Sequence, residues 1–408
     1  MTSWNVEAVR SQFPALHKTI NGRTPIFFDG PAGTQVPRRV IDAVSAYFEN
    51  INANQGGMFP TSQATDEMVD ATRQKLAAFL NASRADEIVI GPNTTSLNFA
   101  LSRAIIKTFS PGDEIVVTRM DHDANVAPWL RAAQDFGLNV RWVEFHDQDI
   151  TLDMDTLEAA LNEKTRLVAT VHASNAAGTI NPVRQIAGMA HAAGALHVVD
   201  AVQSAPHVSL DVQAIGCDFL LCSVYKFYGP HAGILWGRYD LLAELPAYKV
   251  RPSEDTPPFR WETGTPAFEL IAGIGATIDY LASLGEEGGT YREQLVSAYA
   301  RFSRYETELV MHLLDVLETF PNIHIAGITD RSRLSERVPT VIFTHDSYAS
   351  AQVAERLAGQ GIYVWDGNYY AYELMRALNR PDGMVRIGLA HYNTHAEVDR
   401  LAEVLRTL

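Results

Sequence analysis

The sequence predicts an α/β protein in which a mostly parallel sheet is sandwiched by helices, followed by a smaller α+β domain at the C-terminal end. Apolar strand-like runs alternate with helical patterns through the first two thirds of the 408-residue chain, which is typical of a parallel sheet covered by helices. The 47% hydrophobic content over this length allows a large core and more than one domain. We therefore expect a large domain at residues 20–260 and a smaller domain at residues 261–408, with residues 1–19 packing on the smaller one.

The alternation gives the order of the elements in the large domain. The expected strands are EIVIGP, DEIVVTRM, NVRWVEF, RLVATVHA, LHVVDAV and FLLCS. The expected helices between them are SLNFALSRAIIKTF, VAPWLRAAQDFG and the stretches 154–161 and 186–193. In such sheets ligands bind beyond the carboxyl ends of the strands, so side chains at those ends are candidates for a site.

The remainder of the chain has longer helical patterns and shorter strands. Helices are expected at residues 269–284, 291–317 and 395–405, and short strands at VPTVIFT and IYVW. This mixture predicts the smaller α+β domain.

Charge and composition exclude several classes of function. The formal net charge is −15 and the chain has no basic run, so nucleic acid is not an expected partner. The first residues lack a signal-peptide pattern and no apolar stretch approaches the ~20 residues of a membrane span, which predicts a cytoplasmic protein without a membrane partner. Cys217 and Cys222 have neither disulfide-framework nor zinc-site spacing, so we expect buried thiols and no metal.

One lysine stands at a position suited to chemistry. Lys226 follows the strand FLLCS, where a parallel strand would deliver it to the ligand-binding edge. A partly desolvated lysine loses its proton more easily, and the neutral amine can form a Schiff base with an aldehyde. The alternative is a lysine whose stem packs at the strand end while its ammonium group reaches solvent.

Other polar residues stand at neighbouring strand and helix ends. Asp200 and Gln203 follow the strand LHVVDAV, and a carboxylate there could keep a pyridinium nitrogen protonated. Alternatively, Asp200 is a cap or turn residue. Thr94 and Thr95 begin an expected helix, where backbone N–H groups and hydroxyls can bind an anion or serve only as an N-cap.

The chain resembles the class V aminotransferase and cysteine desulfurase family of pyridoxal-phosphate enzymes, which have fold type I, from about Phe13 to Leu405. Eight motifs in the family's order carry the resemblance: FFDGPAGTQVP, GPNTTS, MDHDANVAPW, HASNAAGTINP, VDAVQS, SVYKFYGP, WETGTP and VRIGLAHYNTHAEVDRL. The resemblance implies that residues 20–260 bind pyridoxal 5'-phosphate, with Lys226 as the Schiff-base lysine and Asp200 as the partner of the pyridine nitrogen.

The resemblance also implies roles for the other motif residues. His122 would stack on the cofactor ring, and Asn175 and Gln203 would contact the substrate side and the ring oxygen. The phosphate would be held by Thr94 or Thr95, by Ser223, and by Thr265 of the other subunit of a homodimer with shared active sites. Arg386 would bind the substrate carboxylate through a bidentate pair. Without the resemblance, His122 would be read as a surface histidine and Arg386 as part of a surface ion pair.

The chain departs from the family at two places. Tyr225 stands where the family usually has a histidine before the lysine, and we count it among the cofactor-binding residues. Desulfurase members carry a nucleophilic cysteine in a loop that roughly corresponds to VWDGNYYAYEL, where this chain has Tyr370 and where no cysteine occurs after Cys222. Trp365 and three tyrosines of this loop either pack the two domains together or form an aromatic wall around a substrate side chain, such as a cationic one.

We therefore expect a pyridoxal-phosphate-dependent lyase or transferase acting on an amino acid. β-Elimination from a cysteine derivative, a C–S lyase reaction without a persulfide intermediate, ranks slightly above transamination or epimerisation. A different class would be an inactive binding protein that keeps the cofactor fold. The joint presence of Lys226, Asp200, His122 and Arg386 argues against it, because a scaffold needs none of them.

Overall fold

The alternating pattern of the first two thirds forms one seven-stranded sheet, which confirms the predicted fold class. The computed structural model describes residues 4–408. Only β10 runs against the direction of the other strands of this sheet. The order across the sheet is β2 (Ile88–Gly91), β10 (Gly233–Gly237), β9 (Phe219–Ser223), β8 (Leu196–Asp200), β7 (Thr165–Val171), β3 (Glu114–Thr118) and β4 (Asn139–Val143).

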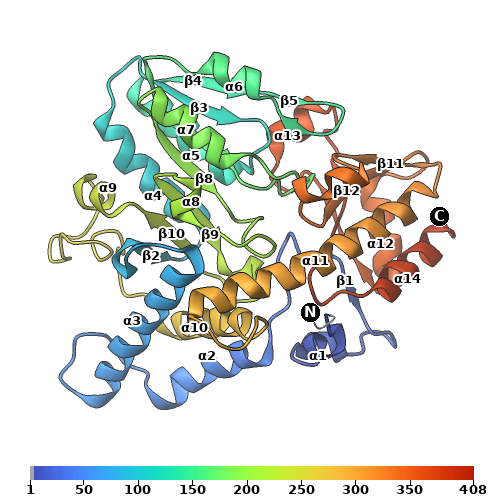
Figure 1. The fold of residues 1–408 in the computed structure, drawn as a ribbon, viewed down its shortest axis with the longest axis horizontal. Coiled ribbons are helices and arrows are strands. Elements are labelled where there is room, and N and C mark those ends of the chain that lie inside the picture. Colours follow the sequence, from blue (N-terminus) through green and yellow to red (C-terminus); the bar gives the residue numbers. More distant parts are fainter. Residues whose placement is uncertain (1–3) are drawn as a thin grey trace.

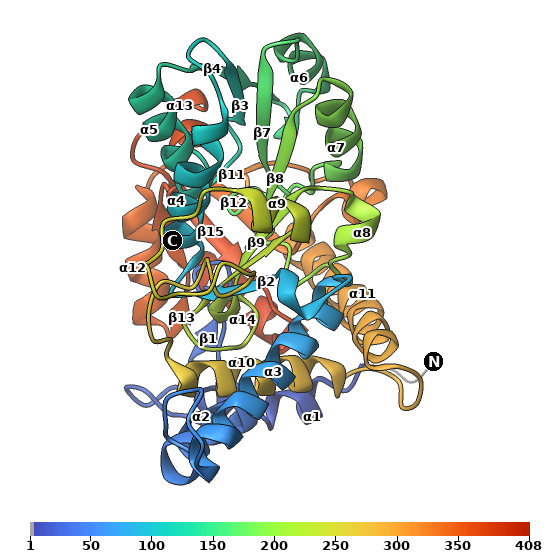
Figure 2. The ribbon, with the colours of Figure 1, turned by 90° about the vertical axis from the view of Figure 1, so that its left-hand side faces the viewer.

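The large sheet has helices on both faces (Figures 1 and 2). In β9, Phe219 and Leu221 pack with one group of helices, whereas Leu220 and Cys222 pack with another, because successive strand side chains point to opposite faces. The first group includes α4 (Thr94–Ile105) and α5 (Ala127–Phe136), and the second α3 (Pro60–Leu80), α10 (Phe268–Ala282) and α11 (Tyr291–Glu318). This double coverage explains the continuous apolar strand runs. The other helices before α10 are α1 (Val6–Arg10), α2 (Arg38–Asn50), α6 (Met154–Ala160), α7 (Val183–Ala192), α8 (Val212–Ile215) and α9 (Tyr239–Glu244).

The C-terminal part contains a second, antiparallel sheet. Its order is β11 (Ile323–Ala326), β12 (Thr340–His345), β15 (Met384–Gly388) and β14 (Trp365–Gly367). The helices α12 (Ser350–Gly359), α13 (Tyr372–Ala377) and α14 (His395–Leu405) belong to this part. The last helix has the predicted bounds because Thr394 and Glu397 form a capping box at its start.

The expected strand IYVW divides into two short strands that belong to different sheets. β13 (Ile362–Tyr363) pairs in parallel with β1 (Ile26–Phe27), whereas β14 pairs with β15. The remaining strands, β5 (Phe145–His146) and β6 (Thr151–Leu152), form a hairpin. β1 therefore ties the N-terminal part of the chain to β13 of the smaller domain.

The packing of α10 favours a domain boundary later in the chain than the predicted one. This helix packs on α2 and α3, and its side chains Ile271, Ile274 and Ile278 share a buried cluster with the large sheet. We therefore propose a boundary after Ala282 rather than at residue 261. The following helix, α11, extends across the molecule from α10 to the smaller domain (Figure 1).

The described part of the N-terminal segment contacts both domains. Val9 and Phe13 lie in the cluster of the large sheet, while Trp4 contacts that cluster and the cluster of the smaller domain. Arg10 donates a hydrogen bond to the Tyr392 carbonyl at 2.7 Å and forms an ion pair with Glu397 at 2.9 Å. We propose that this segment braces the two domains rather than belonging to the smaller one alone.

The described part of the chain, residues 4–408, offers neither a membrane-spanning helix nor a cluster of metal ligands. No helix in this range combines the length and the apolar character needed to cross a bilayer. In the same range, no group of three or more His, Cys, Asp or Glu side chains lies close enough to hold a metal ion.

A buried ion pair holds the segment before α10 against the large sheet. Arg73 of α3 donates two hydrogen bonds to the carboxylate of Glu262, at 2.8 and 2.7 Å, and one to the Ile88 carbonyl at 2.8 Å. Glu262 also accepts a hydrogen bond from the Ile90 N–H at 2.8 Å. The pair thus fixes the motif WETGTP at the edge strand β2.

Replacing Arg73 with Met should lower the free energy of unfolding by roughly 3–5 kcal/mol, since the Glu262 carboxylate would remain buried without its cation. Denaturant unfolding followed by circular dichroism measures this. The control is Arg400→Met, which removes the exposed pair with Glu403 and should leave the midpoint close to that of the unmodified protein. Equal midpoints for both variants would show that the buried pair does not stabilise the fold.

Candidate active site

A cavity of about 890 Å³ lies between the carboxyl edge of the large sheet and the smaller domain. A recess of about 50 Å³ shares Thr95, His122, Asn175, Tyr225 and Lys226 with it and adds Thr94, Asp200, Gln203 and Ser223. Arg386, Trp365 and Tyr370 line the larger cavity. Among the candidate residues from the sequence, only Thr265 lies outside these two spaces.

Lys226 ends a 3-10 turn, Val224–Lys226, that directly follows β9. Its Nζ donates a hydrogen bond to the Pro31 carbonyl. Burial and, to a smaller extent, the nearby Arg386 charge lower the pKa of this amine to about 7, although the carboxylates of Asp200 and Asp29 oppose the shift. A substantial fraction of Lys226 is therefore a neutral, nucleophilic amine near neutral pH.

Asp200 ends β8 and is buried. It accepts a hydrogen bond from the Val202 N–H at 2.9 Å, and burial raises the pKa of its carboxyl group to about 6. A cation facing the recess would favour the charged carboxylate. Gln203, next to it in the recess, donates a hydrogen bond to the Thr340 hydroxyl at 3.1 Å.

The N-cap residue at the start of α4, where an anion could bind, is neither Thr94 nor Thr95. Asn93 is the N-cap and accepts a hydrogen bond from the Ser96 N–H at 2.8 Å. Thr94 is the first helical residue, and its hydroxyl lies 2.6 Å from the Ser223 hydroxyl. The N-cap alternative for the threonines is thus wrong. Both hydroxyls line the recess, where an anion could also meet the N–H groups at the helix start.

His122 lies on the cavity wall with a defined ring orientation. Its Nδ1 accepts a hydrogen bond from the Ala124 N–H at 3.0 Å, so the neutral ring carries its proton on Nε2. Burial, together with the charges of Lys226 and Arg386, lowers the pKa of His122 to about 4. Tyr370 stacks on the ring with centroids 5.4 Å apart.

Arg386, on β15, brings the smaller domain into the cavity. The side chain is 4% exposed, and its Nη1 donates a hydrogen bond to the Asn175 carbonyl at 2.7 Å. Its guanidinium lies 4.2 Å from the centre of the Tyr369 ring. Among residues 4–408, the Arg386 Nε and the Asn175 Oδ1 have no hydrogen-bond partner. The surface ion-pair alternative for Arg386 is wrong, and the free capacity suits a carboxylate ligand.

The aromatic residues of the loop divide between the two predicted roles, which are domain packing and a wall of the substrate cavity. Tyr369 is buried, whereas Trp365 is 50% and Tyr370 is 70% exposed, and all three line the cavity. Tyr369 and Tyr370 both have positive φ angles, 52° and 58°, which side chains adopt only when their surroundings hold them. Tyr372 is exposed and does not line the cavity. Tyr369 thus packs, while Trp365 and Tyr370 form a wall.

Two carboxyl groups near the site received no role from the sequence. Asp29, from FFDGPAG, has a buried Oδ1 without a hydrogen-bond partner in the described chain, and burial raises its pKa to about 6. Asp121 accepts hydrogen bonds from Thr118 and Asn125, and burial raises its pKa to about 8. Both aspartates lie within the motifs quoted above, but an aspartate in an Asp-Gly turn or near a strand end commonly has only a structural role. Only their burial beside Lys226 and Asp200 distinguishes them.

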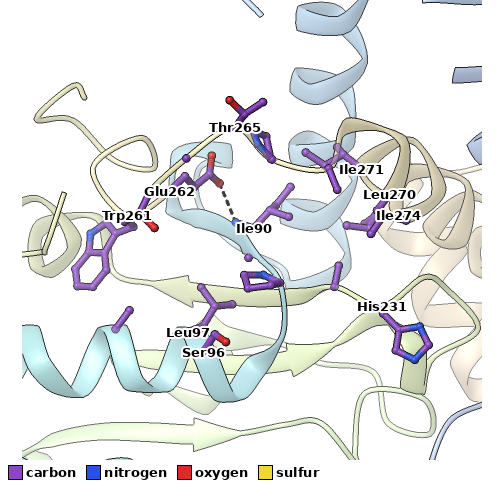
Figure 3. A pocket seen from close by; sticks show the side chains of 18 of the residues that line it. Ile90, Ser96, Leu97, His231, Trp261, Glu262, Thr265, Leu270, Ile271 and Ile274 are labelled. Carbon is purple, nitrogen blue, oxygen red and sulfur yellow. Dashed lines mark hydrogen bonds between the residues drawn. The ribbon is translucent and has the colours of Figure 1, made fainter. Parts of the chain in front are cut away.

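Thr265 is exposed and lines a separate groove of about 760 Å³ (Figure 3). The groove lies between the start of α4 and α10, with Leu97 on one side and Leu270 on the other (Figure 3). Its wall includes His231, which stacks on Tyr225 of the active-site cavity with centroids 4.9 Å apart. A single chain therefore does not bring Thr265 to Lys226, and two stacked rings stand between the groove and the cavity.

The residues of the recess fit pyridoxal phosphate. The buried Asp200 carboxylate suits the ring nitrogen of the cofactor, and the Lys226 amine with its lowered pKa suits the aldehyde. The paired Thr94 and Ser223 hydroxyls suit the phosphate, and the neutral His122 on the wall suits the ring face. The unpaired Asn175 Oδ1 offers a further acceptor beside them. Pyridoxal 5'-phosphate is the cofactor, in agreement with the family match below.

The comparisons with known proteins cover the whole chain. The Aminotransferase class-V family model matches residues 26–401. A cysteine desulfurase of Serratia proteamaculans is 35% identical, over 100% of this chain and 98% of the relative, and a probable cysteine desulfurase of Synechocystis is 33% identical, over 98% and 94%.

Solved structures agree with these sequence matches. The apo cysteine desulfurase of Thermococcus onnurineus superposes with a TM-score of 0.88 at 28% identity, covering 100% of this chain and 99% of that one. The Escherichia coli cysteine desulfurase CsdA, in an S-sulfonic acid form, gives 0.86 at 25% identity, covering 100% and 98%. These matches confirm the enzyme prediction, and the inactive binding protein is set aside. The chain belongs to the class-V aminotransferase family of pyridoxal-phosphate-dependent enzymes.

Proposed function

We propose that this enzyme is a C–S lyase that eliminates the sulfur substituent of a cysteine derivative without forming an enzyme-bound persulfide. The observation that carries the proposal is that no thiol of the chain can reach the active-site cavity. A persulfide requires a cysteine thiolate beside the substrate sulfur. The chain has two cysteines, and both lie in or next to β9.

Both thiols are inaccessible. Cys217 and Cys222 are 2% and 0% exposed, and burial raises the pKa of each thiol well above its ordinary value. Cys222 points into the apolar cluster beneath the sheet rather than toward the cavity. The wall that faces the substrate from the aromatic loop consists instead of Trp365 and Tyr370, whose rings cannot carry a persulfide.

The chain's own groups can manage the protons of an elimination. When bound, pyridoxal phosphate supplies an aldehyde for the substrate amine and a ring that takes up the electron pair left at Cα. The Lys226 amine can take the proton from the substrate Cα, because its lowered pKa leaves it neutral near pH 7. His122 lines the cavity, and its Nε2–H can donate a hydrogen bond to the departing sulfur, which takes up the proton that the Lys226 amine removed from Cα. Arg386 holds the α-carboxylate and so orients the Cα–H bond.

The overall reaction balances without a co-reactant other than water. The Cα–H and Cβ–S bonds break, the sulfur leaves with the electron pair of its bond and takes up a proton, and the three-carbon fragment hydrolyses to pyruvate and ammonia. Transamination and epimerisation begin with the same proton loss, so the identity of the product separates the three reactions.

Formation of the lysine adduct with the cofactor should depend on pH through the titration of Lys226. Below the pKa of about 7 the ammonium cannot attack the aldehyde, so the rate of cofactor uptake by the apoprotein should rise as pH increases through 7. Stopped-flow absorbance measures the rate, and borohydride reduction with peptide mapping locates the adduct. The Lys226→Arg variant is the control and should give no adduct. A midpoint near that of an ordinary lysine, or an adduct on another lysine, would contradict the assignment.

Incubation with cysteine should yield pyruvate and sulfide together, with no persulfide on the protein. Intact-mass spectrometry after the reaction should show no added sulfur, since both thiols are buried. A Cys217→Ser and Cys222→Ala double variant is the matched control and should retain the reaction. Alanine as the product, together with an added sulfur on the protein, would instead identify a desulfurase.

We also propose that two copies share their active sites. The Thr265 groove has an apolar lining, and Met58, Tyr248 and Val250 are exposed on the segments between α2 and α3 and between α9 and α10. Apolar surface of this kind favours a protein partner. The Tyr225–His231 stack would place a second copy in the groove directly beside the active-site cavity. The two free, buried thiols further support the proposed cytoplasmic location.

Complementation between two inactive variants tests the shared site. Lys226→Ala and Thr265→Trp chains should each be inactive alone but regain activity when mixed and allowed to exchange subunits. Each mixed dimer would contain one site with an intact lysine from one chain and an intact threonine from the other. Sedimentation confirms the dimer, and a mixture of two Lys226→Ala preparations is the control. Failure of exchanged mixtures to regain activity would mean that each site is built from one chain.

A further inference from the structure

We propose that the preferred substrate of this site carries a cationic group at the far end of its sulfur substituent, such as an aminoalkyl cysteine. This inference rests on the proposed elimination reaction and names its substrate class. The cavity of about 890 Å³ lies high in the range of ~300–1,000 Å³ that drug-sized ligands occupy.

The charges along the cavity change sign from the inner end to the rim. Lys226 and Arg386 are the only lysine and arginine side chains of its lining, whereas Asp123, Asp366 and Asp382 also line it. Among residues 4–408, none of these three carboxylates forms a side-chain hydrogen bond or ion pair, and all three are at least partly exposed. The inner end thus favours an anion, and the rim favours a cation.

The inner end also shows which part of a ligand it takes. Arg386 and Asn175 are more than nine-tenths buried, and each has an unpaired polar atom in the cavity lining. An amino acid places its α-carboxylate at such a buried donor, while its amine joins the cofactor aldehyde beside Lys226. With that end fixed, the substituent on sulfur must point toward the rim.

Aromatic rings stand beside the rim carboxylates. The Tyr370 carbonyl accepts a hydrogen bond from the Asp123 N–H at 2.7 Å, and its ring stacks on His122. Trp365 precedes Asp366 on β14 and pairs with Arg386 in the sheet register. Aromatic faces combined with carboxylates recognise ammonium groups. An anionic substituent would meet three like charges, and a neutral one would gain from the rings alone.

Three cysteine conjugates of similar length test the charge preference: S-(2-aminoethyl)-, S-(2-hydroxyethyl)- and S-(2-carboxyethyl)-L-cysteine. Pyruvate release gives kcat/KM, and calorimetric titration of the Lys226→Ala holoprotein gives Kd without turnover. We expect the aminoethyl compound to exceed the hydroxyethyl compound by about tenfold in both quantities, and the carboxyethyl compound to be the weakest. The advantage should shrink as salt increases, because the rim is partly exposed.

Variants of the rim should change the selectivity rather than only the rate. Asp366→Asn and Tyr370→Leu should each reduce the ratio of aminoethyl to hydroxyethyl kcat/KM, and Asp366→Lys should reverse it in favour of the carboxyethyl compound. The matched control is Asp147→Asn, an exposed carboxylate in the hairpin of β5 and β6, which should leave the ratio as in the unmodified enzyme.

The outcomes separate the inference from the reaction on which it rests. Equal kcat/KM and Kd values for the three conjugates, with pyruvate formed from all, would overturn the charge preference and leave the elimination intact. Absence of pyruvate with tightest binding of the aminoethyl compound would support the charge preference and overturn the elimination. A selectivity ratio that Asp366→Lys does not change would also overturn the inference.

Discussion

The rest of this structure depends on the burial of ionisable groups at the carboxyl edge of the large sheet. Lys226, Asp200, Asp29 and Arg386 all have pKa values shifted by burial toward their neutral forms. A group in that condition costs free energy unless nearby charges or ligands compensate it. The helices on both faces of the sheet and the smaller domain supply stability that offsets this cost. The same burial makes the lysine a nucleophile and leaves the carboxylate ready to meet a cation.

The smaller domain completes this site through backbone register. Arg386 lies on β15 between β12 and β14, where Ile342 and Trp365 are its partners in the ladder. Its hydrogen bond to the Asn175 carbonyl joins residues that are 211 positions apart. Because both strands are fixed in the antiparallel sheet, the guanidinium and the Trp365 wall keep a constant relation. The N-terminal segment and α11 hold this sheet against the large domain, so the geometry of the cavity depends on contacts far from it.

This chain has no accessible thiol, although the relatives it matches are named cysteine desulfurases. The position available for a reactive group in the loop after β14 carries Tyr370, whose ring stacks on His122. The loop accepts two successive residues in the left-handed region to aim these rings. Backbone strain concentrated beside a cavity is typical of functional loops. In the proposed reaction the chemistry lies with Lys226 and the cofactor, while the loop contributes shape and charge.

The sequence alone determined the large-domain fold and most of the cofactor site. Strand and helix periods are local properties, and parallel strands place their carboxyl ends at one edge, so Lys226, Asp200 and Thr94 could be brought together without coordinates. The chain order of the motifs added His122, Asn175 and Arg386, which the structure gathers in one cavity. Other features depend on contacts between distant segments. They are the packing of α10 with the large domain, the division of IYVW between two sheets, the burial of Asp29 and Asp121, and the carboxylates at the rim. Asp123, Asp366 and Asp382 resemble surface aspartates in sequence, and only the tertiary structure places them around one opening, because residues 123 and 366 meet through the packing of separate domains.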